Sequence, residues 1–455
     1  MIIQNLEELL DKLQNSEIGY IDSISRTKIV TLHISLTFVY KILAIGLSYL
    51  LVPLTINYLN IEQYGIWMTL LSIMSWVGFF DIGLGHGLRN KLAEAVSIND
   101  IKLAKTYVST AFAAVTLVGL IFFFILISIL PFATWDKIFN TTSINNAELL
   151  KVVSIVGFFF LLNFVLSLSN SLYYAYQEAS LPTFRSVLLN LVALIGIYFL
   201  IHYTSGSLLY LGTCYGLSMV LSNLPLIYFF FKKHPEVKPS IKYIDISRIR
   251  EIASLGVKFL IIQMAVLVIF ATDNLIITQV LGPVEVTPYN VVFKLFSIIT
   301  LAHGIILAPL WSAYTDAYAK GDFKWIKKTL KKLNLLMIPI IIAVIILIIF
   351  ARDIINIWVG PNIKYSNLLV VLMGIYTVIS TWSNIYAYFV NGIGKLELQM
   401  YSAIAAGVIN IPLSIYFAKS LAMGTSGVIL GTIVSLSLFS ILGPIQCYYI
   451  IQKDT

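Results

Sequence analysis

Long apolar stretches, separated by short polar segments, follow one another along almost the whole chain. A helix needs roughly 20 apolar residues to cross the hydrocarbon core of a bilayer. The pattern predicts twelve membrane spans, near residues 29–57, 63–88, 106–132, 149–176, 184–203, 208–231, 252–281, 288–312, 333–350, 366–391, 398–418 and 426–451. Backbone polar groups must be paired inside lipid, and no stretch alternates as a membrane β-barrel does. We therefore predict an all-α polytopic membrane protein.

The composition excludes a soluble enzyme. Of the 455 residues, 59% are hydrophobic and only 11% are charged, whereas soluble domains are about 25% charged. The net charge is +8, and most of the 30 lysines and arginines, Arg185 among them, fall in loops on one side of the predicted spans. Because an excess of Lys and Arg marks cytoplasmic loops, both termini are predicted to be cytoplasmic. Residues 1–28 lack the features of a cleaved signal peptide.

The two halves of the chain are similar to each other. A shift of 222 residues places Ile24–Arg26 on Ile246–Arg248 and Asp100 on Asp322, and it preserves the order of the spans. It also preserves the basic loop that follows the second span of each half. Such a parallel repeat implies two six-helix bundles related by a pseudo-twofold axis along the membrane normal. A cleft between two bundles suits alternating access.

The predicted domain organisation follows from this repeat. The segments are a cytoplasmic N-terminal segment (1–28), an N-terminal six-helix bundle (29–231), a basic cytoplasmic linker (232–251), a C-terminal six-helix bundle (252–451) and a cytoplasmic tail (452–455). Apolar residues at helical spacing in the N-terminal segment favour a short helix. That helix either lies on the membrane surface or is a solvated or partner-packed terminal helix.

Three motifs carry a resemblance to a known family. They are Tyr64–Trp67, Asp81–Lys91, and Leu281–Pro283 with Tyr289. The chain resembles the O-antigen and capsule flippases of the multidrug, oligosaccharidyl-lipid and polysaccharide exporter superfamily. The resemblance implies a V-shaped pair of six-helix bundles that carries an undecaprenyl-diphosphate-linked oligosaccharide from the inner to the outer leaflet. It also implies that the first, second, seventh and eighth spans line the cavity.

Four basic residues are predicted to bind the substrate: Lys41, Arg89, Lys258 and Lys294. A charge inside a span costs about 2.5–3.5 kcal/mol on insertion scales, so it calls for a partner, a wet cavity or a function. Lys41 lies about twelve residues into the first span, near the bilayer centre; it either meets the lipid diphosphate or pairs with a neighbouring helix. Lys258 either contributes to the same site or snorkels to the inner surface. Arg89, at the cytoplasmic mouth, either meets the incoming diphosphate or is an orientation anchor.

Two charges lie near the outer ends of the seventh and eighth spans. Asp273 and Lys294 fall at similar depths, roughly 9 to 12 Å from that end, so they are predicted to pair. The pair is either a structural clamp or a switch. In the switch, anionic substrate recruits Lys294 and frees Asp273 to take a proton or a sodium ion, which couples transport to an ion gradient.

A second acid and a histidine occupy equivalent positions in the two halves. Asp81 aligns with His303 under the shift of 222 residues, in the inner halves of the second and eighth spans. Histidine changes charge near physiological pH, so the couple is a candidate proton relay for ion coupling. A hydrogen-bonded structural role for His303 is the alternative.

Glycines and prolines mark predicted bending points. Gly83, Gly85 and Gly87 recur at every second position, with neither the spacing of a nucleotide-binding loop nor a preceding strand. Such glycines let the backbone bend or approach another helix closely. Pro53 and Pro309 each remove a helical hydrogen bond within predicted cavity-lining spans.

Together these features predict a transporter that flips a polyprenyl-diphosphate-linked glycan by alternating access in the bacterial cytoplasmic membrane. We expect no covalent chemistry and no cofactor, with H⁺ or Na⁺ as the coupling ion. The expected partners are the lipid-linked glycan, membrane lipids and other polysaccharide assembly proteins, and no nucleic acid. A multidrug cation antiporter of the same fold is the closest alternative, although the mid-span charges are mostly basic. A membrane glycosyltransferase or polymerase is a second alternative, which the short, mostly basic loops disfavour.

Overall fold

The computed structural model describes residues 23–81, 83–253 and 257–453, and within these ranges the chain forms helices and no strands. The N-terminal half comprises α2 (Ser23–Tyr58), α3 (Ile61–Ser75), η1 (Trp76–Asp81), α4 (Leu84–Ser97), α5 (Ile101–Ile129), α6 (Trp135–Ile138), α7 (Asn146–Leu166), α8 (Ser169–Ala175), α9 (Ser180–Tyr203) and α10 (Leu208–Lys233). A linker follows with η2 (Pro235–Val237), η3 (Ile241–Tyr243), η4 (Ile246–Arg248) and α11 (Ile249–Ile252). The predicted helix near the N-terminus lies outside the described residues.

The C-terminal half repeats the pattern of long helices. It comprises α12 (Val257–Ala271), α13 (Asp273–Leu281), η5 (Pro283–Glu285), α14 (Val286–Leu307), α15 (Leu310–Ala319), α16 (Phe323–Val359), α17 (Asn367–Ile393), α18 (Glu397–Ile415), the π-helical turn η6 (Tyr416–Ser420) and α19 (Thr425–Lys453). Within the described chain, eleven helical segments are long and apolar enough to cross a membrane. The protein is therefore a multi-pass membrane protein.

The twelfth predicted crossing, near residues 63–88, is not one continuous helix. The chain forms α3, then the 3₁₀ helix η1, then α4, and each piece is too short to span a bilayer by itself. Gly83 precedes α4 with a φ of 77°, a left-handed conformation that interrupts a helix and that glycine adopts without strain. The glycine run thus divides the second span instead of only bending it.

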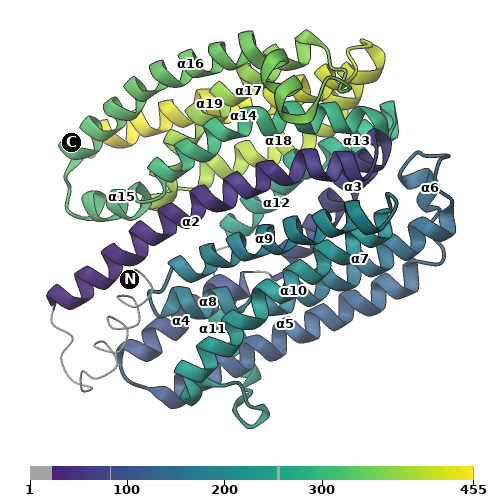
Figure 1. Cartoon of the computed structure of the whole chain (residues 1–455). Coiled ribbons are helices and arrows are strands. Elements are labelled where there is room, and N and C mark those ends of the chain that lie inside the picture. The colour runs from purple at the N-terminus through teal and green to yellow at the C-terminus, as the bar shows by residue number, and fades with distance from the viewer. Residues whose placement is uncertain (1–22, 82, 254–256, 454–455) are drawn as a thin grey trace, which may run out of the picture.

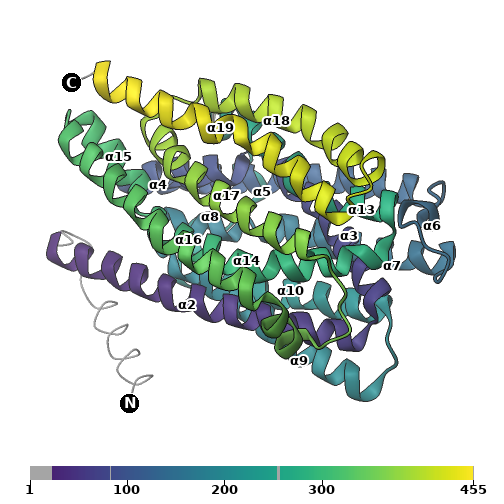
Figure 2. The same ribbon diagram turned by 90° about the horizontal axis from the view of Figure 1, so that it is seen from above.

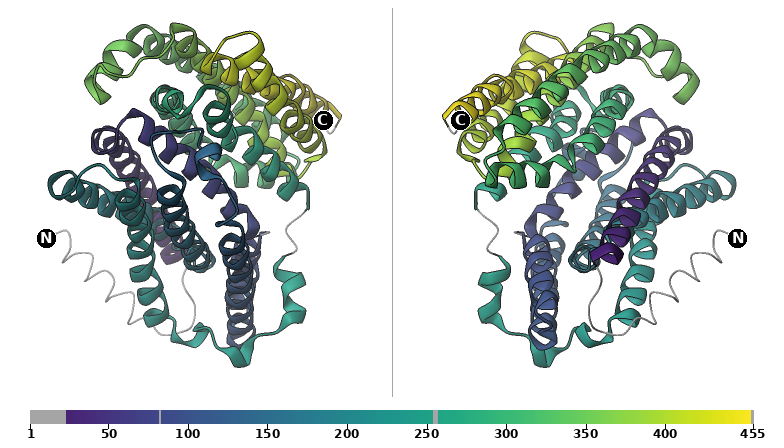
Figure 3. Two further views of the ribbon diagram at one scale, coloured as in Figure 1. Left: turned by 90° about the vertical axis from the view of Figure 1, so that its right-hand side faces the viewer. Right: turned by 90° about the vertical axis from the view of Figure 1, so that its left-hand side faces the viewer.

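The helices form two groups. Figure 1 shows most of the C-terminal helices, α13, α14 and α16 to α19, above α5, α7, α9 and α10 of the N-terminal half, with α2 along the boundary between them. Seen from above, α2 and α18 lie at opposite edges (Figure 2), and the end-on views separate the same two groups (Figure 3). Separate apolar cores fill the halves: one surrounds Leu88 and Leu172 in the N-terminal half, and another surrounds Phe389 in the C-terminal half.

The packing partners repeat as well. In the N-terminal half α2 packs on α9, and α10 packs on α7 and α9. In the C-terminal half α12 packs on α18, and α19 packs on α17 and α18. In each half, therefore, the first span packs on the fifth, and the sixth span packs on the fourth and the fifth. The two bundles expected from the sequence repeat are therefore present.

One turn is reproduced in both halves. Before α5, Asn99 has a φ of 58° and Asp100 caps the helix by accepting a hydrogen bond from the Leu103 amide at 2.9 Å. Before α16, Gly321 has a φ of 69° and Asp322 accepts the equivalent bond from the Trp325 amide, again at 2.9 Å. An aspartate at this position satisfies an amide that the helix leaves unpaired. The alignment of Asp100 with Asp322 therefore has a structural cause.

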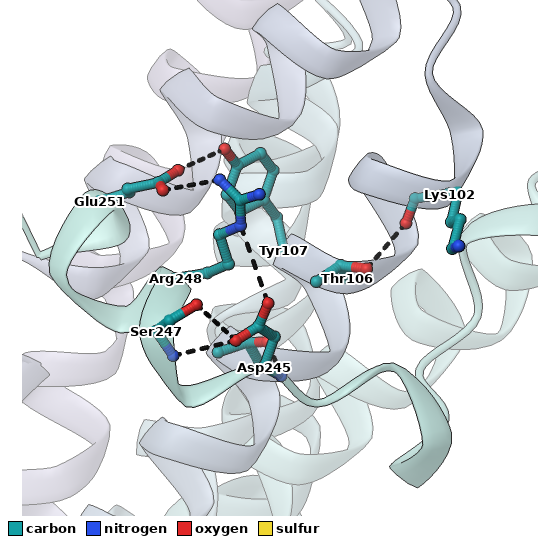
Figure 4. A network of polar contacts seen from close by, with 8 residues as sticks. Lys102, Thr106, Tyr107, Asp245, Ser247, Arg248 and Glu251 are labelled. Carbon is teal, nitrogen blue, oxygen red and sulfur yellow. Dashed lines mark hydrogen bonds and ion pairs between the residues drawn. The ribbon is translucent and has the colours of Figure 1, made fainter.

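The linker between the halves is fastened to α4 and α5. Figure 4 shows Tyr107 of α5 donating a hydrogen bond to Glu251 at 2.7 Å, while Arg248 donates to the other carboxylate oxygen at 2.7 Å. Gly87 lies so close to the linker that a Cβ there would stand 1.5 Å from the carbonyl oxygen of Ile252. Gly87 is thus a close-packing point between the first bundle and the chain that leads to the second.

We expect Glu251→Gln to loosen this linker. The hydrogen bonds from Tyr107 and Arg248 hold the pKa of Glu251 below its usual range. A carboxylate with a lowered pKa stabilises the folded state at neutral pH, and this contribution is lost as the pH falls through that pKa. Amide hydrogen exchange in residues 240–252 should rise about threefold or more in the variant at pH 7, and the difference from the unmodified protein should vanish once the pH falls below the lowered pKa of Glu251. Unchanged exchange at pH 7 would contradict the role of the carboxylate.

Candidate functional site

At one end of the molecule the two bundles are joined by direct hydrogen bonds. The hydroxyls of Thr69 in α3 and Thr278 in α13 lie 2.6 Å apart and are buried. One turn away, the Asn274 amide of α13 donates to the Ser72 hydroxyl of α3 at 2.7 Å. Because both bonds connect helices of different halves, they close the space between the bundles at this end.

The same end contains a close backbone contact and a polar loop. A Cβ on Gly65 of α3 would stand 1.8 Å from the carbonyl oxygen of Pro283, so only glycine fits there. Asn140, just after α6, donates to the carbonyl of Thr278 at 3.0 Å, and Gln279 donates to the carbonyl of Ile138 at 2.6 Å. Two of the family motifs, Tyr64–Trp67 and Leu281–Pro283, therefore meet here. We call this set of contacts the seal; Figure 1 shows α3 and α13 at this end, with α6 nearby.

Lys294 bridges the two bundles on the inner side of the seal. Its ammonium on α14 donates to the Ser48 hydroxyl of α2 at 3.2 Å and lies 5.0 Å from the centroid of the Tyr49 ring. The Tyr49 hydroxyl in turn donates to the carbonyl of Lys294 at 2.6 Å. No carboxylate of the described chain pairs with this ammonium. An uncompensated cation thus stands between the halves.

Lys41 lies on the same face of α2 as Ser48 and Tyr49. It precedes Ser48 and Tyr49 by seven and eight residues, two helical turns, so all three share one helix face. The Lys41 side chain is half-buried and forms no ion pair or hydrogen bond with the described residues. Arg89 is exposed on α4, with its guanidinium carbon 5.0 Å from the Tyr174 ring centroid. Lys258 belongs to α12, but its side chain lies outside the described residues.

The predicted ion pair between Asp273 and Lys294 is not formed. Asp273, only 5% exposed, accepts a hydrogen bond from the Tyr289 hydroxyl at 2.6 Å and from the Thr432 hydroxyl at 3.3 Å. Thr432 lies on α19, so Asp273 faces the interior of the C-terminal bundle, whereas Lys294 faces α2. Similar depth along neighbouring spans does not fix the direction in which a side chain points.

The carboxylate of Asp273 lies among oxygen-bearing groups. Besides the hydroxyls of Tyr289 and Thr432, the amide of Asn410 on α18 donates to Thr432 at 3.2 Å, and the Asn410 carbonyl oxygen is buried without a hydrogen-bond partner. No cation of the described chain pairs with Asp273. Oxygen donors of this kind suit a proton or a hard cation such as Na⁺.

The remaining predicted residues are placed as follows. His303 of α14 is buried, and neither ring nitrogen has a hydrogen-bond partner among the described residues. The side chain of Asp81 lies outside the described residues, so the proposed couple with His303 stays a prediction. Pro53 lies inside a continuous α2, whereas a turn at Ala308 and Pro309, with helical backbone angles, separates α14 from α15. Gly85 lines a cavity in the N-terminal bundle.

One charged residue escaped the sequence reasoning. Arg185 was predicted to be a loop residue, but it lies in the first turns of α9 with Nε and Nη1 buried and without hydrogen-bond partners. The signal was present in the sequence, since Arg185 is the second residue of the predicted fifth span, 184–203. The span boundary at residue 184 placed it at the helix end and hid its burial.

Comparisons with known proteins agree with this architecture. A family profile described as polysaccharide biosynthesis protein matches residues 31–314. The chain belongs to this family. A second profile, MatE, matches residues 259–416. A Salmonella typhimurium protein named as a candidate O-antigen transporter is 25% identical over 91% of this chain and 95% of its own length. A Yersinia pseudotuberculosis protein named as a candidate O-antigen export protein is 21% identical over 87% of this chain and 90% of its own length.

Solved structures show the fold of this family member. An inward-facing multidrug resistance MATE transporter of the MOP superfamily covers 93% of the chain and 98% of its own, with a TM-score of 0.75 and 14% identity. An outward-facing conformation of a MATE transporter gives a TM-score of 0.64 at 14% identity, covering 93% of this chain and 96% of its own. The chain therefore has the MATE fold, a twelve-helix arrangement of two bundles.

Proposed function

We propose that this protein moves an undecaprenyl-diphosphate-linked oligosaccharide, an O-antigen or capsule repeat unit, across the bacterial cytoplasmic membrane. The observation that carries the proposal is Lys294, an ammonium held between the bundles without a carboxylate partner. An unpaired cation in a membrane span is costly unless an anion or water compensates it. Lys41 adds a second such charge on the same face of α2. The names of the relatives as O-antigen transporters support a diphosphate-linked glycan as the anion.

The arrangement of the bundles supports alternating access. The seal lies at one end, and the described ends of the chain, in α2 and α19, lie at the other with α15 and the linker (Figure 1). By the distribution of basic residues, that other end is cytoplasmic. The protein would then be open to the cytoplasm, in keeping with the higher TM-score to an inward-facing transporter. Transport requires the seal to break and the inner ends to approach, with no covalent step.

Asp273 is the proposed site of ion coupling. A buried carboxylate without a cationic partner costs several kcal/mol. A proton or Na⁺ at Asp273 removes this cost, so its arrival or departure biases the packing of α13, α14 and α19 around it. Since α13 carries the seal residue Thr278, the ion site and the seal share one helix. His303 and Asp81 remain the second proposed coupling positions.

The MATE fold and the buried Asp273 also favour a second function, a multidrug cation antiporter. An antiporter of cationic drugs needs acidic groups where the substrate binds. Here the carboxylate faces the interior of the C-terminal bundle, and Lys294 and Lys41 stand on the faces between the bundles. The placement of these charges supports an anionic substrate.

A proteoliposome assay separates these functions. The purified protein is reconstituted with fluorescently labelled polyprenyl-diphosphate oligosaccharide, and its access to an external lectin is followed with and without proton or sodium gradients. The proposal predicts gradient-stimulated translocation of intact substrate. Accumulation of a longer glycan would indicate a glycosyltransferase or polymerase, and gradient-driven uptake of ethidium without glycan translocation would indicate a cation antiporter.

A further inference from the structure

The N-terminal bundle contains a cavity that neither the seal nor Lys294 explains. Its volume is about 180 Å³, several times the roughly 30 Å³ that a water molecule occupies in the liquid. Its lining residues are Met74, Ser75, Val77, Gly78, Gly85, Val115, Phe160, Asn163, Phe164, Ser167, Leu168 and Ser171. None of the described residues in this lining is charged. Hydroxyls and an amide beside aromatic rings suit a neutral ligand that is rich in hydroxyl groups, as a sugar ring is.

One guanidinium group lies beside this cavity, and a second lies on α9, which packs on α8 and α10. Arg89 follows the lining residue Gly85 by one turn on α4, and Tyr174 follows the lining residue Ser171 by one turn on α8. The Arg89 guanidinium carbon lies 5.0 Å from the centre of the Tyr174 ring. The electrostatic neighbours of Arg185, the second guanidinium, are the phenols of Tyr174 and Tyr215. Tyr174 therefore interacts electrostatically with both arginines.

Arg185 is the feature that calls for a ligand. Its Nε and Nη1 atoms are buried, no described residue forms a hydrogen bond with them, and no described carboxylate pairs with Arg185. Burying an uncompensated charge costs several kcal/mol, and an arginine offers five donors in a planar fork that matches phosphate oxygens. A fixed, unsatisfied guanidinium inside a bundle is the arrangement that an anion would complete.

We infer that Arg89, Tyr174 and Arg185 form a binding site in the N-terminal bundle for the phosphate groups of a glycosyl diphosphate, whose first sugar occupies the adjoining neutral cavity. This inference rests on the proposed function and assigns the headgroup of that substrate to a place. The arginines lie at the cytoplasmic end of the bundle, near the starts of α4 and α9, whereas Lys294 lies beneath the seal. The diphosphate thus has one cationic site near its entry and another near its exit.

Binding to the full-length protein in detergent tests the two parts of the site separately. The probes are inorganic pyrophosphate and geranyl-diphosphate-linked N-acetylglucosamine, with dissociation constants measured by titration calorimetry. Arg185→Gln should weaken both probes about tenfold or more, because it removes charge-assisted hydrogen bonds. Arg185→Lys keeps the charge and should retain part of the affinity. Ser171→Leu, which fills the cavity, should weaken the glycosyl probe and leave pyrophosphate unchanged.

Two controls keep the result specific. Lys327→Gln removes an exposed charge on α16 and should leave both constants unchanged. An excess of phosphatidylglycerol tests whether any lipid phosphate occupies the site, and equal competition against both probes would overturn the assignment to a glycosyl diphosphate. Pyrophosphate binding that is unaffected by Arg185→Gln in a folded variant would overturn the anion site, and a Ser171→Leu variant that binds the glycosyl probe normally would overturn the sugar cavity.

The proposed function fails independently of this site. If the unmodified protein translocates no glycan in proteoliposomes but binds pyrophosphate in an Arg185-dependent way, the flippase proposal is wrong and the anion site stands. If translocation is observed and Arg185→Gln changes neither binding nor translocation, the flippase proposal stands and the site is wrong.

Discussion

Lys294→Gln is expected to slow glycan translocation by about tenfold to a hundredfold, the effect of losing one hydrogen-bonded charge. Glutamine retains a donor for the Ser48 hydroxyl, so the contact between α14 and α2 survives while the cation is lost. Initial rates in proteoliposomes give the change directly. Lys294→Arg restores the charge and should recover most of the rate.

Ser48→Ala is the matched control for this lysine. It removes the hydroxyl that accepts the bond from Lys294 at 3.2 Å and leaves the ammonium in place. If Lys294 acts only as a strut between the bundles, Ser48→Ala and Lys294→Gln should be equally harmful. If the charge meets the substrate, Ser48→Ala should cost far less. A Lys294→Gln protein with the unmodified rate would remove the lysine from the transport pathway.

The sequence was sufficient for the fold because hydrophobic length and repetition are strong signals in a membrane protein. Spans must be apolar over their whole length, and a duplicated half repeats its caps, as Asp100 and Asp322 do. The broken second span was missed because hydropathy does not register backbone geometry. Gly83 is compatible with a helix by composition and leaves it by adopting a left-handed φ of 77°.

The site was less predictable for a related reason. Depth along a span follows from counting residues, but the direction of a side chain depends on which helices pack against it. Asp273 and Lys294 were assigned to each other at similar depth, yet one points toward α19 and the other toward α2. Arg185 was assigned to a loop, and its burial depends on the packing of α9 on α8 and α10, which hydropathy does not register.

Asp273→Asn is expected to abolish the response of transport to an ion gradient. Asparagine has nearly the shape of aspartate and can still accept a hydrogen bond from Tyr289, so the packing around it should be kept. It can carry no negative charge, so the side chain no longer needs a proton or cation when it is buried. In proteoliposomes the imposed gradient should raise the translocation rate of the unmodified protein about tenfold or more. It should change the rate of the variant little, while the variant still binds the substrate.

The identity of the ion follows from a second measurement on the same pair of proteins. If Na⁺ binds Asp273 with help from the hydroxyl of Thr432 and the carbonyl oxygen of Asn410, saturating Na⁺ should raise the Tm of the unmodified protein and leave that of Asp273→Asn unchanged. Thr432→Val, which removes one oxygen donor but keeps the carboxylate, should reduce the shift without eliminating it. If the coupling ion is a proton instead, Na⁺ should change the Tm of neither protein, and a pH gradient alone should drive transport by the unmodified protein. A variant that still responds to either gradient would show that the coupling charge lies elsewhere, and His303 would be the next residue to replace.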